Sequence, residues 1–279
     1  MSESERYRVC IIMPNGYIHS SAFVEVAFLL KASLGSVGID CDLKLNEPAP
    51  DRINVILGSH LIKWSDDLSR YKYIPYQLEQ LSANEGAYNE NLRAILQSAW
   101  AVWDYSLENI EFLASQGITA HHLPVGYHAA LEQLPTAPQK DVDVLFYGSI
   151  GGRRSPVLEA LAARGDLQIK TLFGVYGRDR DSWISRSKMV LNVHYYAVKI
   201  FEAVRISYLL NNRCFVLSEE SAINPYPGVS IPTATYDTLV DATVHYANQA
   251  QERTRLAAEA YEQFKMLYPM EKLVERVLQ

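Results

Sequence analysis

The stretch from Asp141 to Glu220 constrains the fold of this chain more than any other part of the sequence. Apolar runs of strand length alternate in it with segments of helix length, and the runs end in glycine or polar turns. The first run, Val142 to Phe146, is too short for a helix and stops before Gly148, as expected of a buried parallel strand. Such alternation predicts an α/β domain built on a parallel sheet.

A glycine-rich turn follows this first strand. The backbone from Gly148 through Ser149 to Gly152 can approach a ligand closely, and it leads into a helix whose N-terminus favours an anion. Arg153 and Arg154 stand in the same loop, and an arginine side chain presents a planar fork of donors that matches phosphate oxygens. Cations are disfavoured at a helix N-terminus unless an anion binds there. We therefore predict a phosphate site here, rather than a solvated helix start.

A second polar cluster is predicted farther along the chain. The apolar strand 188–193 carries His194, Tyr195 and Tyr196 at its carboxyl end, and from Lys199 onward the apolar spacing becomes helical. We expect Lys199 and Glu202 in the first turn of that helix. A carboxylate there complements the helix dipole and can accept hydrogen bonds from the hydroxyl groups of a ribose.

Two further candidates follow the strand expected at 167–173. Tyr176 and Gly177 are placed to line a nucleobase, although Tyr176 can equally be a packing residue. Because ligands of an open parallel sheet bind outside the carboxyl ends of its strands, all of these side chains are expected to gather at one edge.

The order of these features resembles the donor half of GT-B glycosyltransferases. The resemblance is carried by the glycine turn with its arginines, the aromatic strand end, the pair Lys199 and Glu202, and a strand that ends in Ser218 and Glu219. It is most similar to the small bacterial group-1 type related to the spore-maturation glycosyltransferases. In retaining members of that fold, two glutamates stand at the spacing of His194 and Glu202, and the second one binds ribose. His194 departs from the pattern, so the stereochemical outcome stays open.

The resemblance implies an α/β fold with two Rossmann-like domains that face each other across a cleft. A chain of 279 residues, 48% of them hydrophobic, is long enough for two such cores. We expect an acceptor domain at 1–126, a proline-containing linker at 127–140 and a donor domain at 141–279. In the family that it resembles, a final helix such as 271–278 often returns to the first domain.

The resemblance also implies an activity, the transfer of a sugar from a nucleotide-diphosphate sugar to a glycan, small-molecule or protein acceptor. Lys199 would stabilise the charge on the leaving diphosphate, and no cofactor or metal is expected. Three Asp-x-Asp sequences, which begin at Asp40, Asp141 and Asp179, are interpreted as solvated caps. Two alternatives stay open: a nucleotide-sugar epimerase or hydrolase on the same fold, and a non-catalytic nucleotide-binding or glycan-binding module.

The amino-terminal half contributes two candidates for a catalytic base. His19 follows the strand expected at 7–13, and an imidazole can accept a hydroxyl proton near neutral pH. Glu79 follows the strand expected at 73–76, where a half-apolar setting can raise the pKa of a carboxyl group. The alternatives are a histidine bonded to a loop carbonyl and a glutamate that caps the next helix. The proline in strand 73–76 suggests an edge strand or a strand end.

Composition and charge narrow the remaining classes. A net charge of −6 argues against general nucleic-acid binding. Three scattered cysteines indicate a reducing compartment without a disulfide framework or a zinc site. The first residues show no signal-peptide core, and no apolar run approaches about 18 residues. We expect a soluble, cytoplasmic protein, and the sequence does not indicate its oligomeric state.

Overall fold

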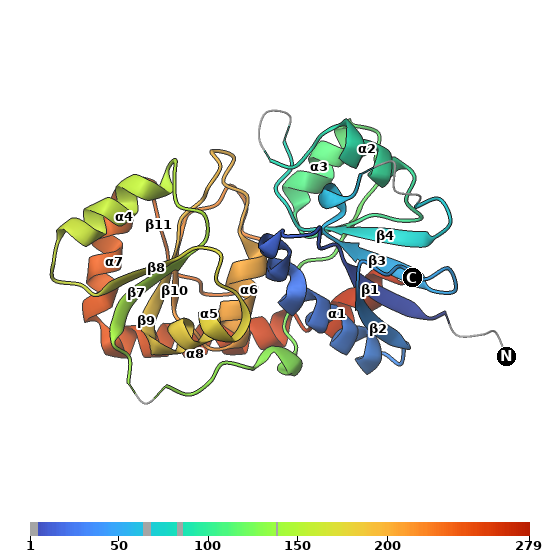
Figure 1. The fold of residues 1–279 in the computed structure, drawn as a ribbon. Coiled ribbons are helices and arrows are strands. Elements are labelled where there is room, and N and C mark those ends of the chain that lie inside the picture. Colours follow the sequence, from blue (N-terminus) through green and yellow to red (C-terminus); the bar gives the residue numbers. More distant parts are fainter. Residues whose placement is uncertain (1–4, 64–67, 83–85, 138) are drawn as a thin grey trace. The chain divides into compact units, whose positions relative to one another are not determined.

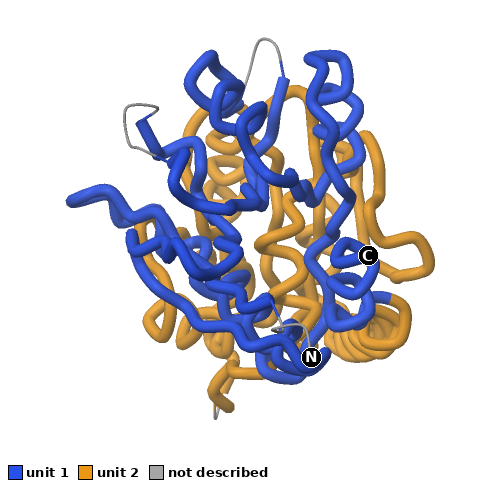
Figure 2. Tube along the Cα trace, turned by 90° about the vertical axis from the view of Figure 1, so that its right-hand side faces the viewer, with its two compact units in different colours: residues 1–131, 268–279 blue, residues 132–267 orange. Residues whose placement is uncertain are grey.

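The chain forms two compact α/β units in the computed structural model, which describes residues 5–63, 68–82, 86–137 and 139–279. The first unit comprises residues 1–131 and 268–279, and the second comprises 132–267 (Figure 2). Each unit has its own parallel sheet with flanking helices, so the prediction of two Rossmann-like α/β units is confirmed.

The first unit is built on a six-stranded parallel sheet (Figure 1). In spatial order its strands are β2 (Cys41–Leu45), β1 (Tyr7–Ile11), β3 (Ile53–Leu57), β4 (Lys72–Gln77), β5 (Trp103–Asp104) and β6 (His121–His122). Because β1 lies between β2 and β3, the strand order reverses there, and ligands of such sheets bind at that point.

Pro75 lies inside this sheet, which corrects the expectation of an edge strand. It pairs with Ile56 of β3, and β4 is flanked by β3 and β5. The short strand β5 pairs only with Tyr76 and Gln77, the two residues beyond the proline. The missing N–H of a proline is tolerated because no ladder with β5 has yet begun at that position.

Short helices connect these strands and cover the sheet. They are the 3₁₀ segments η1 (Ile18–Phe23), η2 (Ser59–Leu61) and η3 (Ala129–Leu131) and the helices α1 (Val24–Ser36), α2 (Glu90–Gln97), α3 (Leu107–Ser115) and α9 (Met270–Val277). The side chains of Asn89 and Ser106 cap α2 and α3 by accepting from backbone N–H groups.

The last helix of the chain belongs to the first unit. Tyr127 donates its N–H to the carbonyl of Tyr268 at 2.7 Å, and Met270 donates to the carbonyl of Tyr127 at 2.8 Å. Helix α9 then packs against α1. The division between the units therefore falls after 131 and again before 268. The sequence-based prediction had a linker at 127–140 and assigned residues 268–279 to the second domain.

One helical stretch is long and apolar enough to cross a membrane by length and composition, and this corrects the expectation that no apolar run comes near that length. It runs from Ile18 to Ser36 with a mean hydropathy of 1.2, and 44% of it is buried within the protein. A core helix meets the same criterion. Within the first unit α1 packs against β1 and β2 and buries Leu29, Leu30 and Leu34.

The second unit is built on a five-stranded parallel sheet with the order β11 (Thr233–Ala234), β10 (Val216–Glu219), β9 (Ser187–Asn192), β7 (Val142–Tyr147) and β8 (Ile169–Leu172). Its helical segments are α4 (Arg154–Ala163), α5 (Gly177–Arg186), α6 (Ala203–Asn211), η4 (Tyr236–Thr238), α7 (Leu239–Asn248) and α8 (Ala250–Leu267). Apolar residues of β7, β9 and β10 pack with α4 and α7 to form its core. The strand order reverses at β7, between β8 and β9.

The three Asp-x-Asp sequences are not solvated caps throughout. Asp42 pairs with Arg8, Asp143 with Lys188 and Asp181 with Arg180. Each of these aspartates has a partly or largely buried side chain, and the interpretation as solvated caps is wrong for them. Ion pairing, and not exposure to water, satisfies these carboxylates.

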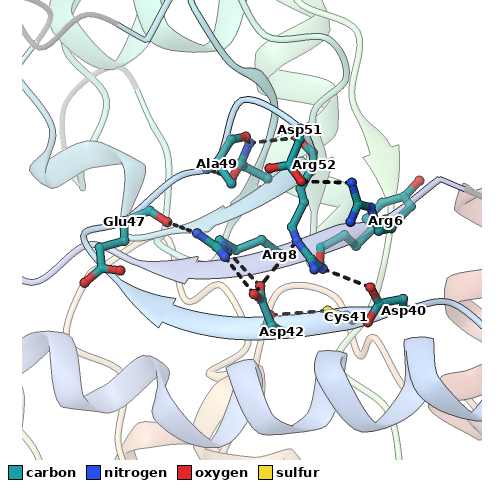
Figure 3. Close-up of polar contacts among 11 residues, drawn as sticks. Arg6, Arg8, Asp40, Cys41, Asp42, Glu47, Ala49, Asp51 and Arg52 are labelled. Carbon is teal, nitrogen blue, oxygen red and sulfur yellow. Dashed lines mark hydrogen bonds and ion pairs between the residues drawn. The ribbon is translucent and has the colours of Figure 1, made fainter.

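Arg8 and Asp42 tie the edge strand β2 to β1 (Figure 3). They are opposite each other in the register of the two strands. The Arg8 guanidinium donates two hydrogen bonds to Asp42, at 2.8 and 2.7 Å, and a third to the carbonyl of Glu47 at 2.9 Å. These hydrogen bonds from Arg8 hold the pKa of Asp42 below its usual value. The pair therefore fixes β2, which the chain leaves at the edge of the sheet.

We predict that Asp42→Asn lowers the free energy of unfolding by about 1–2 kcal/mol, because it removes one charge-assisted bond from a half-buried pair. Urea unfolding at pH 7 measures the loss. Asp51→Asn is the matched control, since Asp51 pairs with Arg6 at a more exposed position, and it should cost less than about 0.5 kcal/mol. Equal losses for both variants would contradict this account. The difference between Asp42→Asn and the wild type should begin to shrink below about pH 4, the usual pKa of an aspartate, and should vanish only below the lowered pKa that Asp42 has in the folded protein.

Candidate functional site

The predicted phosphate and ribose residues gather at the carboxyl ends of β7, β9 and β10. Arg153 lies in the loop after β7, His194 and Lys199 follow β9, and Glu219 is the last residue of β10. These strands are neighbours, and the reversal point of the sheet lies beside β7. The candidate site therefore occupies the edge at which open α/β sheets bind ligands.

The glycine turn after β7 has the backbone that only glycine adopts without strain. The φ angles of Gly148, Gly151 and Gly152 are 135°, 141° and 52°. A Cβ atom at Gly148 would lie 2.7 Å from Nη2 of Arg205, whereas a Cβ atom at Gly151 would meet nothing within 4 Å. Gly148 is thus required for two reasons, its φ angle and the close approach of a buried guanidinium.

Glu202 lies between two arginines. Its Oε1 accepts from Nη2 of Arg154 at 2.6 Å, and its Oε2 lies 2.6 Å from Nη1 of Arg205. Burial opposes ionisation of this carboxyl group, but the charges of Arg205 and Arg154 outweigh it and hold the pKa of Glu202 below its usual value. Nη1 of Arg205 also donates to Oδ1 of Asn192 at 2.6 Å. Glu202 is therefore an ionised group that organises two buried cations.

The start of α6 differs from the expectation. The helix begins at Ala203, so Glu202 occupies the N-cap position and Lys199 lies outside the helix, in a left-handed conformation with φ 53°. The prediction that both residues lie in the first turn is wrong. Arg205 was not among the predicted site residues, although its spacing of three from Glu202 is that of an ion pair on a helix surface.

Arg154 supports the site from within. Its Nε donates to the carbonyl of Val193 at 2.7 Å and its Nη1 to the carbonyl of Ser149 at 3.1 Å. Together with the bond to Glu202, these contacts use much of the donor capacity of the guanidinium. Burial lowers the pKa of Arg154, although the charge of Glu202 opposes the shift. Arg154 therefore links the loops after β7 and β9.

Glu219 forms a second carboxylate centre that the sequence analysis did not assign. Nη1 and Nη2 of Arg153 donate to its two oxygens at 3.1 and 2.5 Å. The backbone N–H of His194 donates to Oε2 at 3.1 Å, and Nζ of Lys199 lies 3.6 Å from Oε1. The guanidinium of Arg153 also stacks over the ring of Tyr236, 4.6 Å from its centroid.

His194 is fully buried between the two carboxylate centres. Its Nε2 lies 3.0 Å from Oγ of Ser221, and Nδ1 has no hydrogen-bond partner in the described part of the chain. Burial lowers the pKa of His194 even though Glu202 and Glu219 favour its charged form. The imidazole is therefore neutral at pH 7.

The aromatic candidates lie at the same edge. Tyr195 and Tyr196 pack edge to face with their ring centroids 5.0 Å apart, and the guanidinium of Arg154 lies 5.2 Å from the Tyr195 ring. Tyr176 is half-buried at the N-cap of α5, and Gly177 begins that helix with φ 57°. These residues follow β9 and β8, on either side of the glycine turn after β7.

The candidate bases lie at the carboxyl edge of the first sheet. His19 is half-buried in η1 and packs edge to face against Tyr17, 5.3 Å between centroids. Glu79 is half-buried after β4, and its backbone carbonyl accepts from Nδ2 of Asn109 at 2.8 Å. His60, which follows β3 and was not a candidate, has its pKa lowered to about 4 by burial. Such an imidazole is too weak a base for proton abstraction at neutral pH.

The described residues contain no group of three or more histidine, cysteine, aspartate or glutamate side chains that could hold a metal ion. At the edge of the second sheet, the two glutamates have arginine and lysine partners instead.

We predict that Gly148→Ala costs about 2 kcal/mol more stability than Gly151→Ala, as measured by urea unfolding. Both variants place alanine at a similar positive φ, so backbone strain lowers the stability of both. Only the first one pushes against Arg205, which cannot yield without breaking its bonds to Glu202 and Asn192. Equal losses would show that Arg205 moves aside freely.

Comparison with known proteins adds the following. No protein-family model matches this chain. Two uncharacterized proteins of Acanthamoeba polyphaga mimivirus are similar in sequence. Protein L137 is 29% identical over 139 residues, which cover 48% of this chain and 19% of that protein. Protein L140 is 24% identical over 183 residues, which cover 62% and 54%. The chain thus spans about half or less of the length of these relatives.

Solved structures are similar in fold. AviGT4, a glycosyltransferase involved in avilamycin A biosynthesis, superposes with a TM-score of 0.61 at 12% identity, over 98% of this chain and 96% of that one. An α-glucosyltransferase in complex with UDP and a 13-mer DNA gives 0.60 at 10% identity, over 98% and 100%. A mutant of S. aureus TarM in complex with fondaparinux, α-GlcNAc-glycerol and UDP gives 0.59 at 10% identity, over 83% and 55%.

At these identities the likeness shows the fold alone. Because the solved structures are GT-B glycosyltransferases, the predicted GT-B fold is confirmed. The narrower resemblance to the spore-maturation type stays a prediction.

Proposed function

We propose that this protein is a glycosyltransferase that moves a sugar from a nucleotide-diphosphate sugar to a glycan, small-molecule or protein acceptor. The observation that carries the proposal is the charge arrangement at the carboxyl edge of the second sheet. Four cations, Arg153, Arg154, Lys199 and Arg205, surround two carboxylates, Glu202 and Glu219.

The balance of charge at this edge suits a diphosphate. Four positive and two negative side chains leave a net charge of +2 when His194 is neutral, and the two linking phosphates of a nucleotide-diphosphate sugar carry two negative charges. Cations held in place before the reaction stabilise the further charge that develops on a leaving diphosphate. Lys199 is the cation with the most exposed side chain, and we assign it that role. The charge of these side chains supports transfer without a metal ion.

The other assignments follow from position. Tyr176 and Gly177 would line the nucleobase, and Tyr195, which is exposed, would contact the donor together with Tyr196. On the acceptor side, His19 or Glu79 would act as the base if the reaction inverts configuration. The UDP in the complexes of the α-glucosyltransferase and of TarM supports a nucleotide donor for this chain as well.

We predict that nucleoside diphosphates, tested as a panel that includes UDP, bind to the protein in the presence of EDTA. Isothermal titration calorimetry measures the affinity. Arg153→Gln and Lys199→Gln should each weaken binding about tenfold or more, because each removes a cation from the diphosphate. Arg186→Gln is the matched control, since Arg186 pairs with Asp141 at the opposite end of the sheet. The proposed function fails if no diphosphate binds, or if binding requires a metal ion.

A further prediction concerns Glu202. Each of its oxygens has an arginine partner but retains a lone pair, which we propose accepts a ribose hydroxyl. Glu202→Gln should therefore weaken UDP by about 1–2 kcal/mol more than it weakens 2′,3′-dideoxy-UDP, as calorimetry on the four combinations measures. Comparing two ligands on one variant cancels any change in the arginines. A coupling energy of zero would limit Glu202 to holding Arg154 and Arg205.

A further inference from the structure

The two carboxylates at the carboxyl edge of the second sheet hold different kinds of cation. Glu202 pairs with Arg154 and Arg205, whose side chains are only 5% and 12% exposed. Glu219 pairs with Arg153 and Lys199, whose side chains are 25% and 40% exposed. The two cations that Glu219 holds are therefore the more accessible ones to a ligand.

Glu219 itself is inaccessible to a ligand. Its side chain is 0% exposed, and both of its oxygens are occupied by the contacts with Arg153, Lys199 and the N–H of His194. Burying a carboxylate is unfavourable unless it is paired and hydrogen-bonded, and Glu219 meets that condition through three residues from two different loops. It acts as an anchor from β10 to the loops that follow β7 and β9.

Some N–H donors of the Arg153 guanidinium are not used by Glu219. The bonds to Glu219 use one hydrogen from each terminal nitrogen, which leaves three of the five guanidinium donors. No other acceptor among the described residues takes them. Stacking on Tyr236 holds the plane of the group, and the hydroxyl of Tyr236 donates to the backbone carbonyl of Arg153 at 2.8 Å. The guanidinium is therefore fixed on one side and open to a ligand on the other.

Lys199 is fixed in a similar way. Its backbone adopts a left-handed conformation, and its carbonyl accepts from the N–H of Ala222 at 3.2 Å, just beyond the end of β10. Its ammonium group lies 3.6 Å from Glu219 and is otherwise exposed. One buried carboxylate thus sets the positions of both accessible cations.

We propose that Glu219 is a positioning residue that holds Arg153 and Lys199 so that their outward donors bind the two phosphates of the donor. This inference rests on the proposed function. It also predicts the direction in which the affinity for an anion changes when Glu219 is neutralised. If Glu219 merely competed with the ligand for the cations, its neutralisation would strengthen anion binding; if it positions them, neutralisation weakens binding.

The test measures the affinity of inorganic pyrophosphate and of UDP for Glu219→Gln by calorimetry in EDTA. We expect both affinities to fall about tenfold or more, because the amide donates where Arg153 also donates. The matched control is Glu220→Gln, which changes the same charge at the neighbouring, exposed position and should leave both affinities within about twofold. Unchanged or tighter binding to Glu219→Gln, with normal binding to the wild type, would overturn the inference alone.

A double-mutant cycle separates positioning from a general structural effect. In an Arg153→Gln background, Glu219→Gln should weaken pyrophosphate by a clearly smaller factor than in the wild type, because one of the cations that it positions is already gone. An equal loss in both backgrounds would overturn the inference. If Glu219→Gln does not fold, Arg153→Gln and Lys199→Gln decide, since normal pyrophosphate affinity in both would overturn it. Failure of the wild type to bind either ligand would overturn the proposed function and the inference together.

Discussion

Pairing between buried carboxylates and basic side chains is the interaction on which the candidate site depends. Loops at strand ends have few apolar contacts of their own, and their backbone would otherwise be free to move. Glu202 and Glu219 tie the loops after β7 and β9 to each other and to β10. Breaking either centre would leave a buried charge without a partner, which costs far more than an exposed ion pair contributes.

The Glu202 and Glu219 centres differ in how accessible their cations are. The Glu202 centre is closed, since Arg154 and Arg205 also bond to Val193, Ser149 and Asn192. The Glu219 centre is open, since Lys199 and Arg153 retain donors beyond the carboxylate. The more buried arginines of the Glu202 centre thus give the neighbouring loops a rigid support, while the more exposed cations of the Glu219 centre face a ligand. Gly148 leaves room for the Glu202 centre, because a Cβ atom there would lie only 2.7 Å from Nη2 of Arg205.

The sequence predicted the parts of this architecture that depend on local signals. Strand-length apolar runs located β7 and β9, and the spacing of glycines located the turn whose positive φ angles the structure shows. Contacts between distant segments were not predictable in this way. Glu219 meets Arg153 across 66 positions, and only the order of the strands brings them together. The start of α6 was misplaced because the apolar spacing continues through Ile200 and Phe201, which pack without being helical.

The return of the chain to the first unit has a consequence for folding. The second unit is continuous in sequence, from 132 to 267, whereas the first unit is completed only by residues 268–279. Helix α9, which packs on α1, leaves the ribosome more than two hundred residues after α1 does. We therefore expect synthesis to reverse the usual order in which amino-terminal domains fold first. The first unit would complete its fold only after the second unit has folded, and until then α1 would lack its contact with α9.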